Sequence, residues 1–148
     1  MRKPINFLIK KFLVGLFDKS MLMNKDNIVS MITPIENASL LDLGCNDGGW
    51  SCILAEKAGI KDLYGIDIVD ERIKQAEALG IKVKKADLNN PFPYPDNSFD
   101  IAHANQVIEH IAYLDTFVSE IYRVLKPGGY CVISSVPSAR LREFPRWA

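Results

Sequence analysis

The stretch LLDLGCNDGGW, Leu40 to Trp50, constrains the fold more than any other part of the chain. Its first four residues are apolar apart from Asp42, which is typical of a buried strand. Three glycines then follow within six residues, and a helical spacing of apolar side chains begins at Trp50. Glycines let the backbone turn sharply and approach a ligand closely, because no Cβ stands in the way. The stretch therefore predicts a strand, a tight turn and a helix, with the turn as a candidate ligand site.

The rest of the chain repeats this alternation. Short apolar runs predict buried strands at 40–43, 63–66, 81–83, 99–102 and 130–136. Apolar side chains at helical spacing separate these runs, most clearly between Leu114 and Leu125. The segment LKPGG that follows predicts the end of this helix and a turn into the last strand. Strands that alternate with helices imply βαβ crossovers, so the predicted fold class is α/β, a Rossmann-like doubly wound parallel sheet with N-terminal helices.

Composition narrows the class of protein further. The chain has 148 residues, of which 48% are hydrophobic, and it carries 18 basic and 18 acidic side chains. A single globular domain fits this length, and the absence of net charge argues against nucleic acid as a partner. Cys45, Cys52 and Cys131 form no CxxC pair, so neither a disulfide framework nor a metal site is predicted. A cytoplasmic location is expected, because a reducing compartment suits unpaired cysteines.

The end of the second predicted strand points to the kind of ligand. The segment YGIDIVD places Asp67 at a strand end, where a carboxylate can accept hydrogen bonds from ribose hydroxyls. A dinucleotide site needs a further glycine where Asn46 stands, and Asp47 puts negative charge where a pyrophosphate lies. A nucleoside with a cationic centre and no phosphate, such as S-adenosylmethionine, suits this turn better. An NAD-dependent oxidoreductase is the alternative.

Several motifs occur in an order that is typical of one family. They are LDLGCNDGG, LYGIDI, KKADLNN, NSFDIAHANQVIEHI and RVLKPGGYCVIS. With them the chain resembles the class I S-adenosylmethionine-dependent methyltransferases, in the type 11-like group that methylates small molecules, from about Leu40 to Val136. Asn46 departs from the pattern, because the family usually has glycine there.

The resemblance implies a cofactor site at the glycine-rich turn and at the strand ends beside it. The implied residues are Asp42, Gly44, Cys45, Asn46, Gly48, Asp67, Ile68, Asp87, Leu88 and Asn105. Within this set Asp67 binds the ribose, while Asp87 accepts a hydrogen bond from the adenine amino group and Leu88 supplies a backbone amide. The turn and Asn105 lie beside the methionine part of S-adenosylmethionine.

Methyl transfer depends mainly on alignment of the acceptor with the methyl group, and a base is needed only when the acceptor carries a proton. His110 is the candidate catalytic base, since similar family members often have EH at this point beside the acceptor and imidazole titrates near neutral pH. The alternative interpretation is a histidine that packs at a helix start. His103, within or just past the fourth predicted strand, is interpreted as a packing residue.

The N-terminal part, residues 1–33, is predicted to be helical and to precede a cofactor-binding core at 34–148. Apolar residues at helical spacing, flanked by Lys10 and Lys11, predict a helix that caps the pocket or packs on the sheet. Alternatively this helix lies on an anionic membrane surface, which would make the protein peripheral to the membrane and bring it to lipid-linked acceptors.

The C-terminal part predicts a truncated sheet. The family normally has two strands beyond the fifth, and the sequence after Val136 suggests none, so the core is expected to be incomplete at that end. An open sheet edge favours self-association as a homo-oligomer. The expected function is methyl transfer from S-adenosylmethionine to a small-molecule or lipid-linked acceptor, and a non-catalytic module that binds the same cofactor is a second alternative. The chain is expected to bind the cofactor but to turn over slowly or not at all.

Overall fold

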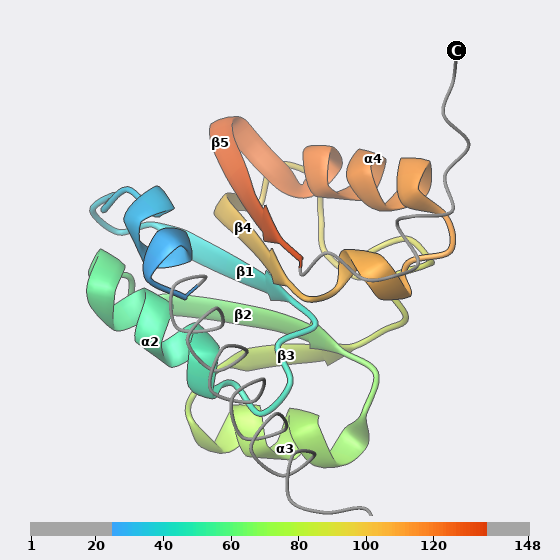
Figure 1. Ribbon diagram of the computed structural model, residues 1–148, viewed down its shortest axis with the longest axis horizontal. Helices are drawn as coiled ribbons and strands as arrows, with labels where there is room; N and C mark the ends of the chain where they lie inside the picture. Colours follow the sequence, from blue (N-terminus) through green and yellow to red (C-terminus); the bar gives the residue numbers. More distant parts are fainter. Residues whose placement is uncertain (1–24, 136–148) are drawn as a thin grey trace, which may run out of the picture.

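The computed structural model describes residues 25–135, and Figure 1 shows a parallel sheet flanked by helices. The strands are β1 (Ser39–Leu43), β2 (Asp62–Asp67), β3 (Lys82–Lys85), β4 (Phe99–Asn105) and β5 (Leu125–Ser134). They pair in the order β3-β2-β1-β4-β5, and every pairing is parallel. The strand order reverses between β1 and β4, which confirms the predicted doubly wound α/β fold. The predicted helix before residue 25 and the tail after residue 135 lie outside the described residues.

The faces of the sheet are covered by helices that include α2 (Gly49–Ala58), α3 (Asp70–Ala78) and α4 (Leu114–Val124). Alternate residues of a strand point to opposite faces. Leu40 of β1 accordingly packs in a cluster with Leu54 of α2, whereas Leu41 packs in another cluster with Phe117 of α4. The sheet is therefore the middle layer, with α2 and α4 on opposite sides (Figure 1).

The end of the predicted N-terminal segment belongs to this core. Residues 25–31 are helical. Ile28 is 1% exposed and Ile32 is 6% exposed, and both pack with Leu40 and Ala58 on the α2 side of the sheet. None of the helices found between residues 25 and 135 has the length and hydropathy to span a membrane.

The structure differs from the sequence prediction at two places, the apolar face of α4 and the LKPGG segment. The predicted apolar face of α4 buries Phe117 and Ile121 but leaves Val118 and Tyr122 exposed, because a helix that covers one sheet face buries only a narrow stripe. The LKPGG segment is an irregular start of β5 rather than a separate turn, since the register with β4 shifts between Phe99 and Ile101. The helix ends at Val124, directly before the segment in which the sequence predicts its end.

Candidate functional site

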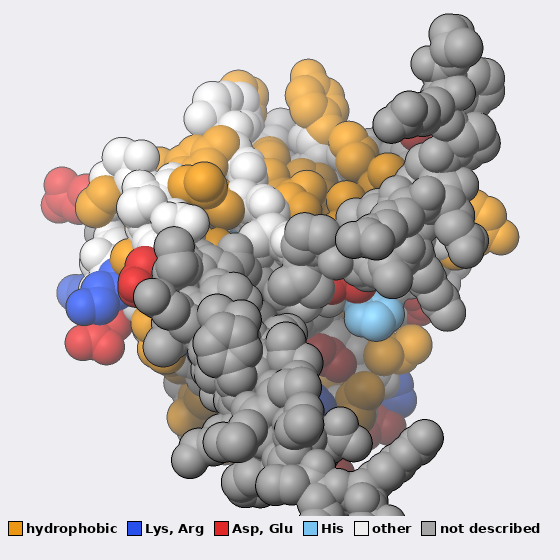
Figure 2. Space-filling model, viewed as in Figure 1, with side chains coloured by type: hydrophobic (Ala, Val, Ile, Leu, Met, Phe, Trp, Pro, Cys, Tyr) orange, Lys and Arg blue, Asp and Glu red, His pale blue; other side chains and the backbone are white. Residues whose placement is uncertain are grey.

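A cavity of about 600 Å³ opens at the carboxyl ends of the strands around β1, where the strand order reverses. This is the position at which doubly wound sheets bind ligands. Its lining residues are Asp42, Gly44, Cys45, Asn46, Asp47, Trp50, Asp67, Ile68, Ala86, Asp87, Leu88, Asn89, Asn105, Gln106, Val107, His110 and Ile111. On the face seen in Figure 2, acidic and histidine side chains lie next to each other beside hydrophobic ones.

The glycine-rich turn wraps one side of the cavity. Gly44 has a φ of 73°, and a Cβ there would lie 2.7 Å from Cγ2 of Val107. Asn46 has a φ of 50°, which is the left-handed region where asparagine is tolerated better than most residues. Asn46 therefore adopts a left-handed backbone conformation that glycine also adopts readily. Gly48 does not line the cavity, because its Cβ position faces Ile81, at 2.5 Å from the Cδ1 atom.

The Asp67 carboxylate is fixed by backbone donors at the end of β2. Oδ1 accepts hydrogen bonds from the N–H groups of Ile68 at 2.8 Å and Val69 at 2.9 Å. Oδ2 accepts one from the N–H of Asn46 at 2.8 Å. Because each carboxylate oxygen has two lone pairs, Oδ2 keeps capacity for a ligand hydroxyl. The turn and the strand-end acid thus hold each other in place at the cavity wall.

A second carboxylate that lines the cavity is that of Asp87, which follows the neighbouring strand β3. Its Oδ1 accepts hydrogen bonds from both the backbone N–H and the side-chain Nδ2 of Asn89, each at 2.9 Å. These hydrogen bonds hold the pKa of Asp87 below its ordinary value. No hydrogen bond from residues 25–135 reaches Oδ2, so an ionised oxygen is available to a ligand donor. Asn89 also accepts a hydrogen bond from the N–H of Ala112 at 2.7 Å, which ties this wall to the segment after His110.

His110 ends the 3₁₀ turn η1 (Ile108–His110), and its side chain is exposed at the cavity. Gln106, just before this turn, has a φ of 59°, another left-handed backbone position at the cavity wall. Asn105 accepts a hydrogen bond from the Ser134 hydroxyl at 2.7 Å, so its amide is oriented by the neighbouring strand. The end of β4 and η1 therefore form the wall that carries the candidate base.

Beneath the cavity lies a buried polar group centred on Asp42, which is 3% exposed. Nδ1 of His103 lies 2.8 Å from Oδ1 of Asp42, and the hydroxyl of Ser51 donates to Oδ2. His103 is fully buried, as the sequence predicts, but its pairing with Asp42 could not be predicted from residues so far apart in the chain. These hydrogen bonds allow a carboxylate to remain in the core.

The thiol of Cys45, which lines the cavity, is unreactive. Burial raises the pKa of the Cys45 thiol to about 12, with a further contribution from Asp42 and Asp67. The thiol is neutral at physiological pH and is not a nucleophile. Among the described residues no cluster of histidine, cysteine or acidic side chains is arranged to hold a metal ion.

The family model for the methyltransferase domain matches residues 41–133. The chain belongs to the family of class I S-adenosylmethionine-dependent methyltransferases. The match spans the strands and turns that form the cavity. Every residue that the resemblance implied for the cofactor lines the cavity except Gly48, and His110 lines it too.

Methyltransferases of several organisms are similar to this chain. A demethylmenaquinone methyltransferase of Listeria welshimeri is 32% identical over 115 residues, which cover 70% of this chain and 48% of that protein. A sterol 24-C-methyltransferase of Pneumocystis carinii is 36% identical over 101 residues, 64% of this chain and 26% of that protein. The crystal structure of an S-adenosylmethionine-dependent methyltransferase from Mesorhizobium loti superposes with a TM-score of 0.67 at 26% identity, covering 74% of this chain and 52% of that one. The chain thus spans about half the length of the Listeria relative.

Some residues at this methyltransferase cavity were missed by the sequence analysis. They are Trp50, Ala86, Asn89, Gln106, Val107 and Ile111. Each lies within or next to one of the quoted motifs, so their nearness to the glycines and strand ends was a usable signal. What the sequence alone does not give is which side of each turn faces the cavity.

Proposed function

We propose that this methyltransferase chain binds S-adenosylmethionine in the cavity and serves methyl transfer to a small apolar or lipid-linked acceptor. The observation that carries the proposal is the convergence of Asp67, Asp87 and His110 on one cavity at the strand-order reversal. A cavity of about 600 Å³ is in the usual size range for a cofactor or small-molecule site. When bound, S-adenosylmethionine supplies an electrophilic methyl group on a sulfonium centre.

The residues of the cavity fit this cofactor at both ends. Oδ2 of Asp67 accepts a ribose hydroxyl, and the ionised Asp87 accepts the adenine amino group, with Ile68 exposed to lie against the ring. At the other end, Gly44 lines the cavity where the methionine part is proposed to bind, and its backbone packs against Val107 so closely that a Cβ would clash there. The carboxyl group of Asp42, which His103 and Ser51 hold in place, also lines the cavity.

His110 is proposed as the base that receives a proton from the acceptor. It lies on the cavity wall with its imidazole exposed, so an acceptor that enters the cavity can reach it. A positioned base typically accelerates such a step by about 10²- to 10⁴-fold. In this proposal, the cavity wall around His110 aligns the acceptor with the methyl group.

An apolar acceptor suits the cavity, since Trp50, Val107 and Ile111 are among its lining residues. The relatives described above are named for demethylmenaquinone and for sterols, both of which are lipid-like molecules. This supports a lipid-like acceptor for the present chain as well.

A nicotinamide dinucleotide fits less well. The N-terminus of α2 is where a pyrophosphate would bind in a dinucleotide site. Here the carboxylate of Asp47 already accepts a hydrogen bond from the N–H of Gly49, at 3.1 Å. A pyrophosphate would have to displace this negative charge, whereas a ligand without phosphate does not.

The test is methyl transfer from radiolabelled S-adenosylmethionine to short-chain demethylmenaquinol and, separately, to a sterol with a side-chain double bond. Label in either product supports the proposed acceptor class. The variant His110→Asn should then be slower by about 100-fold or more. Glu109→Gln is the matched control, because Glu109 precedes His110 but does not line the cavity. Absence of transfer to both acceptors, with the cofactor bound, would contradict the acceptor class.

A further inference from the structure

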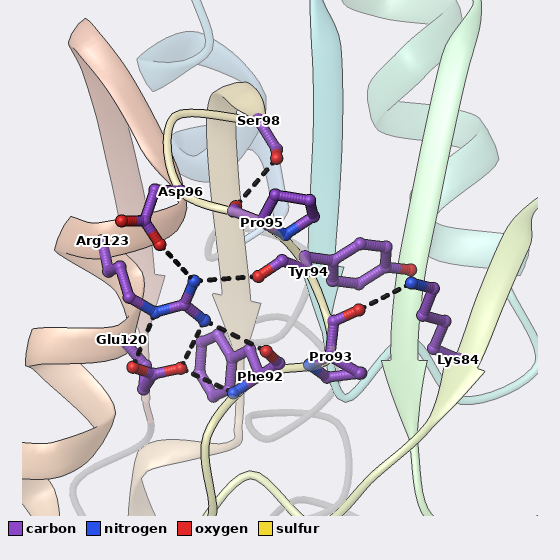
Figure 3. Close-up of polar contacts among 9 residues, drawn as sticks. All are labelled: Lys84, Phe92, Pro93, Tyr94, Pro95, Asp96, Ser98, Glu120 and Arg123. Atoms are coloured by element: carbon purple, nitrogen blue, oxygen red, sulfur yellow. Dashed lines mark hydrogen bonds and ion pairs between the residues drawn. The ribbon is translucent and has the colours of Figure 1, made fainter.

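The loop 86–98 joins β3 to β4 and contains no helix or strand among its residues. Its first part, 86–89, lines the cavity, whereas its middle part lies against α4. A loop without regular structure must find hydrogen-bond partners for its backbone elsewhere. Here the partners are the side chains of Glu120 and Arg123, which point from α4 toward the loop in Figure 3.

Arg123 uses all five of its N–H donors. Nε and Nη2 donate to the two carboxylate oxygens of Glu120, at 2.8 and 2.6 Å. Nη2 also donates to the carbonyl of Phe92 at 3.0 Å, and Nη1 donates to the carbonyl of Tyr94 at 2.8 Å and to Asp96 at 2.7 Å. Only the planar guanidinium has five donors in a fixed arrangement, so lysine cannot reproduce these contacts.

Glu120 completes the attachment. Its Oε2 accepts a hydrogen bond from the N–H of Phe92 at 2.6 Å, so both backbone groups of Phe92 are held by this pair. The Glu120 side chain is 13% exposed and that of Arg123 is 29% exposed. Partly buried, bidentate ion pairs of this kind hold their geometry better than exposed pairs do.

The same part of the loop is attached on its other side to the sheet. The hydroxyl of Tyr94 lies 3.0 Å from the carbonyl oxygen of Gly65 and 3.1 Å from that of Lys82. Nζ of Lys84 donates to the carbonyl of Pro93 at 2.6 Å. The Phe92 ring packs edge-on against Phe117 of α4, with 5.9 Å between ring centroids. The middle of the loop is thus held between α4 and the strands β2 and β3.

This attachment fixes one end of the segment that faces the adenine ring. Asp87 follows Ala86, whose N–H donates to the carbonyl of Asp67 at 3.1 Å. The next firm attachment toward the C-terminus that involves α4 is Phe92. Between these two points the hydrogen bond from the N–H of Ala112 to Asn89 also holds the segment, and release of Phe92 would leave the part after Asn89 to be ordered when the cofactor binds.

We propose that Glu120 and Arg123 are positioning residues for the cofactor, which act by holding the loop 86–98 so that Asp87 and Leu88 meet the adenine ring. The inference rests on the proposed function, in which those two residues bind adenine. It extends the site to two side chains that do not line the cavity. They are positioning rather than catalytic residues, because neither side chain lines the cavity.

The test measures binding of two ligands by calorimetry: S-adenosylhomocysteine and its inosine analogue, in which an oxo group replaces the adenine amino group. The wild-type chain should prefer S-adenosylhomocysteine, because Asp87 accepts the amino group. The Arg123→Lys variant keeps the charge and loses the carbonyl contacts. It should bind S-adenosylhomocysteine about tenfold more weakly and bind the inosine analogue with a smaller loss, so the preference shrinks.

The control is Lys126→Met. Lys126 lies three residues after Arg123 and pairs with Asp100 of β4 at 2.8 Å, away from the loop. This variant should keep both affinities and their ratio. Thermal unfolding of each variant shows whether the fold is intact. If Arg123→Lys does not fold, Glu120→Gln serves instead, since it keeps the side-chain shape and weakens the bonds to Arg123 and to Phe92.

The possible outcomes distinguish failure of the positioning role from failure of the proposed function. A folded Arg123→Lys or Glu120→Gln variant with an unchanged ligand preference would overturn the positioning role alone. A wild-type chain that binds both ligands equally would overturn the adenine contact of Asp87, and the positioning role with it. A wild-type chain that binds neither ligand would contradict the proposed function itself.

Discussion

Replacement of Asp67 by alanine probes the ribose end of the site. In the structure the carboxylate accepts three backbone hydrogen bonds, from Asn46, Ile68 and Val69, and Oδ2 retains one lone pair for the ligand. Hydrogen bonds to a charged group contribute about 1.5 to 3 kcal/mol. Loss of one ribose hydrogen bond should therefore weaken binding of S-adenosylhomocysteine by about 10- to 150-fold.

The substitution also affects the turn. The three backbone N–H groups lose their acceptor, but Asn46 and Val69 lie at the surface, where water can replace it. We therefore expect a small loss of thermal stability beside a large loss of affinity. The opposite result, a large drop in stability with an unchanged affinity, would mean that Asp67 serves the turn alone.

Calorimetric titration with S-adenosylhomocysteine measures the affinity, and thermal unfolding measures the stability of the same samples. Asp70→Ala is the matched control, since Asp70 is a nearby exposed acid that pairs with Lys85 and does not line the cavity. It removes the same charge without touching the ligand. A dissociation constant of Asp67→Ala within about twofold of the control would refute ribose binding by this residue.

Two further predictions concern the packing and the pH dependence of the fold. Gly44→Ala should destabilise the protein by about 1 to 3 kcal/mol more than Gly59→Ala in urea unfolding, because both positions have positive φ but only at Gly44 does the new Cβ meet a neighbour, Val107. Equal losses of unfolding free energy in the two variants would show that the strain of a positive φ accounts for the whole effect at Gly44. The hydrogen bond from Arg123 lowers the pKa of Glu120 below its ordinary value of 4.5, so this pair stabilises the fold above that pH and loses its contribution as pH falls through the lowered pKa. Urea unfolding on both sides of that pH should show a smaller acid-induced loss for Glu120→Gln than for the wild type, and identical acid profiles would contradict the assignment.

The parallel sheet could be predicted from the sequence because each strand is a short buried run next to a helical segment. Leu40 and Leu41, for example, are both fully buried, on opposite faces. The ends of the strands were predicted less accurately from the sequence. For example, β4 extends to Asn105, because its last residues still pair with β5. The hydrophobic pattern alone ended that strand at Ala102.

The site could be predicted in part for the same reason. Motif residues at strand ends converge because parallel strands end at one edge of the sheet. Contacts between distant segments carry no local signal, so the pairing of Asp42 with His103 and the contact of Asn89 with Ala112 were not foreseen. Arg123 was part of a recognised motif, but its contacts with the loop 86–98 depend on how α4 packs.

The central claim is that the cavity beside β1 is built for S-adenosylmethionine. Calorimetric titration of the wild-type chain with S-adenosylhomocysteine and, separately, with NAD tests it most directly. We expect saturable binding of S-adenosylhomocysteine at one site and no binding of NAD, because Asp67 and Asp87 suit the nucleoside while Asp47 occupies the place of a pyrophosphate. Binding of NAD without binding of S-adenosylhomocysteine would contradict the account.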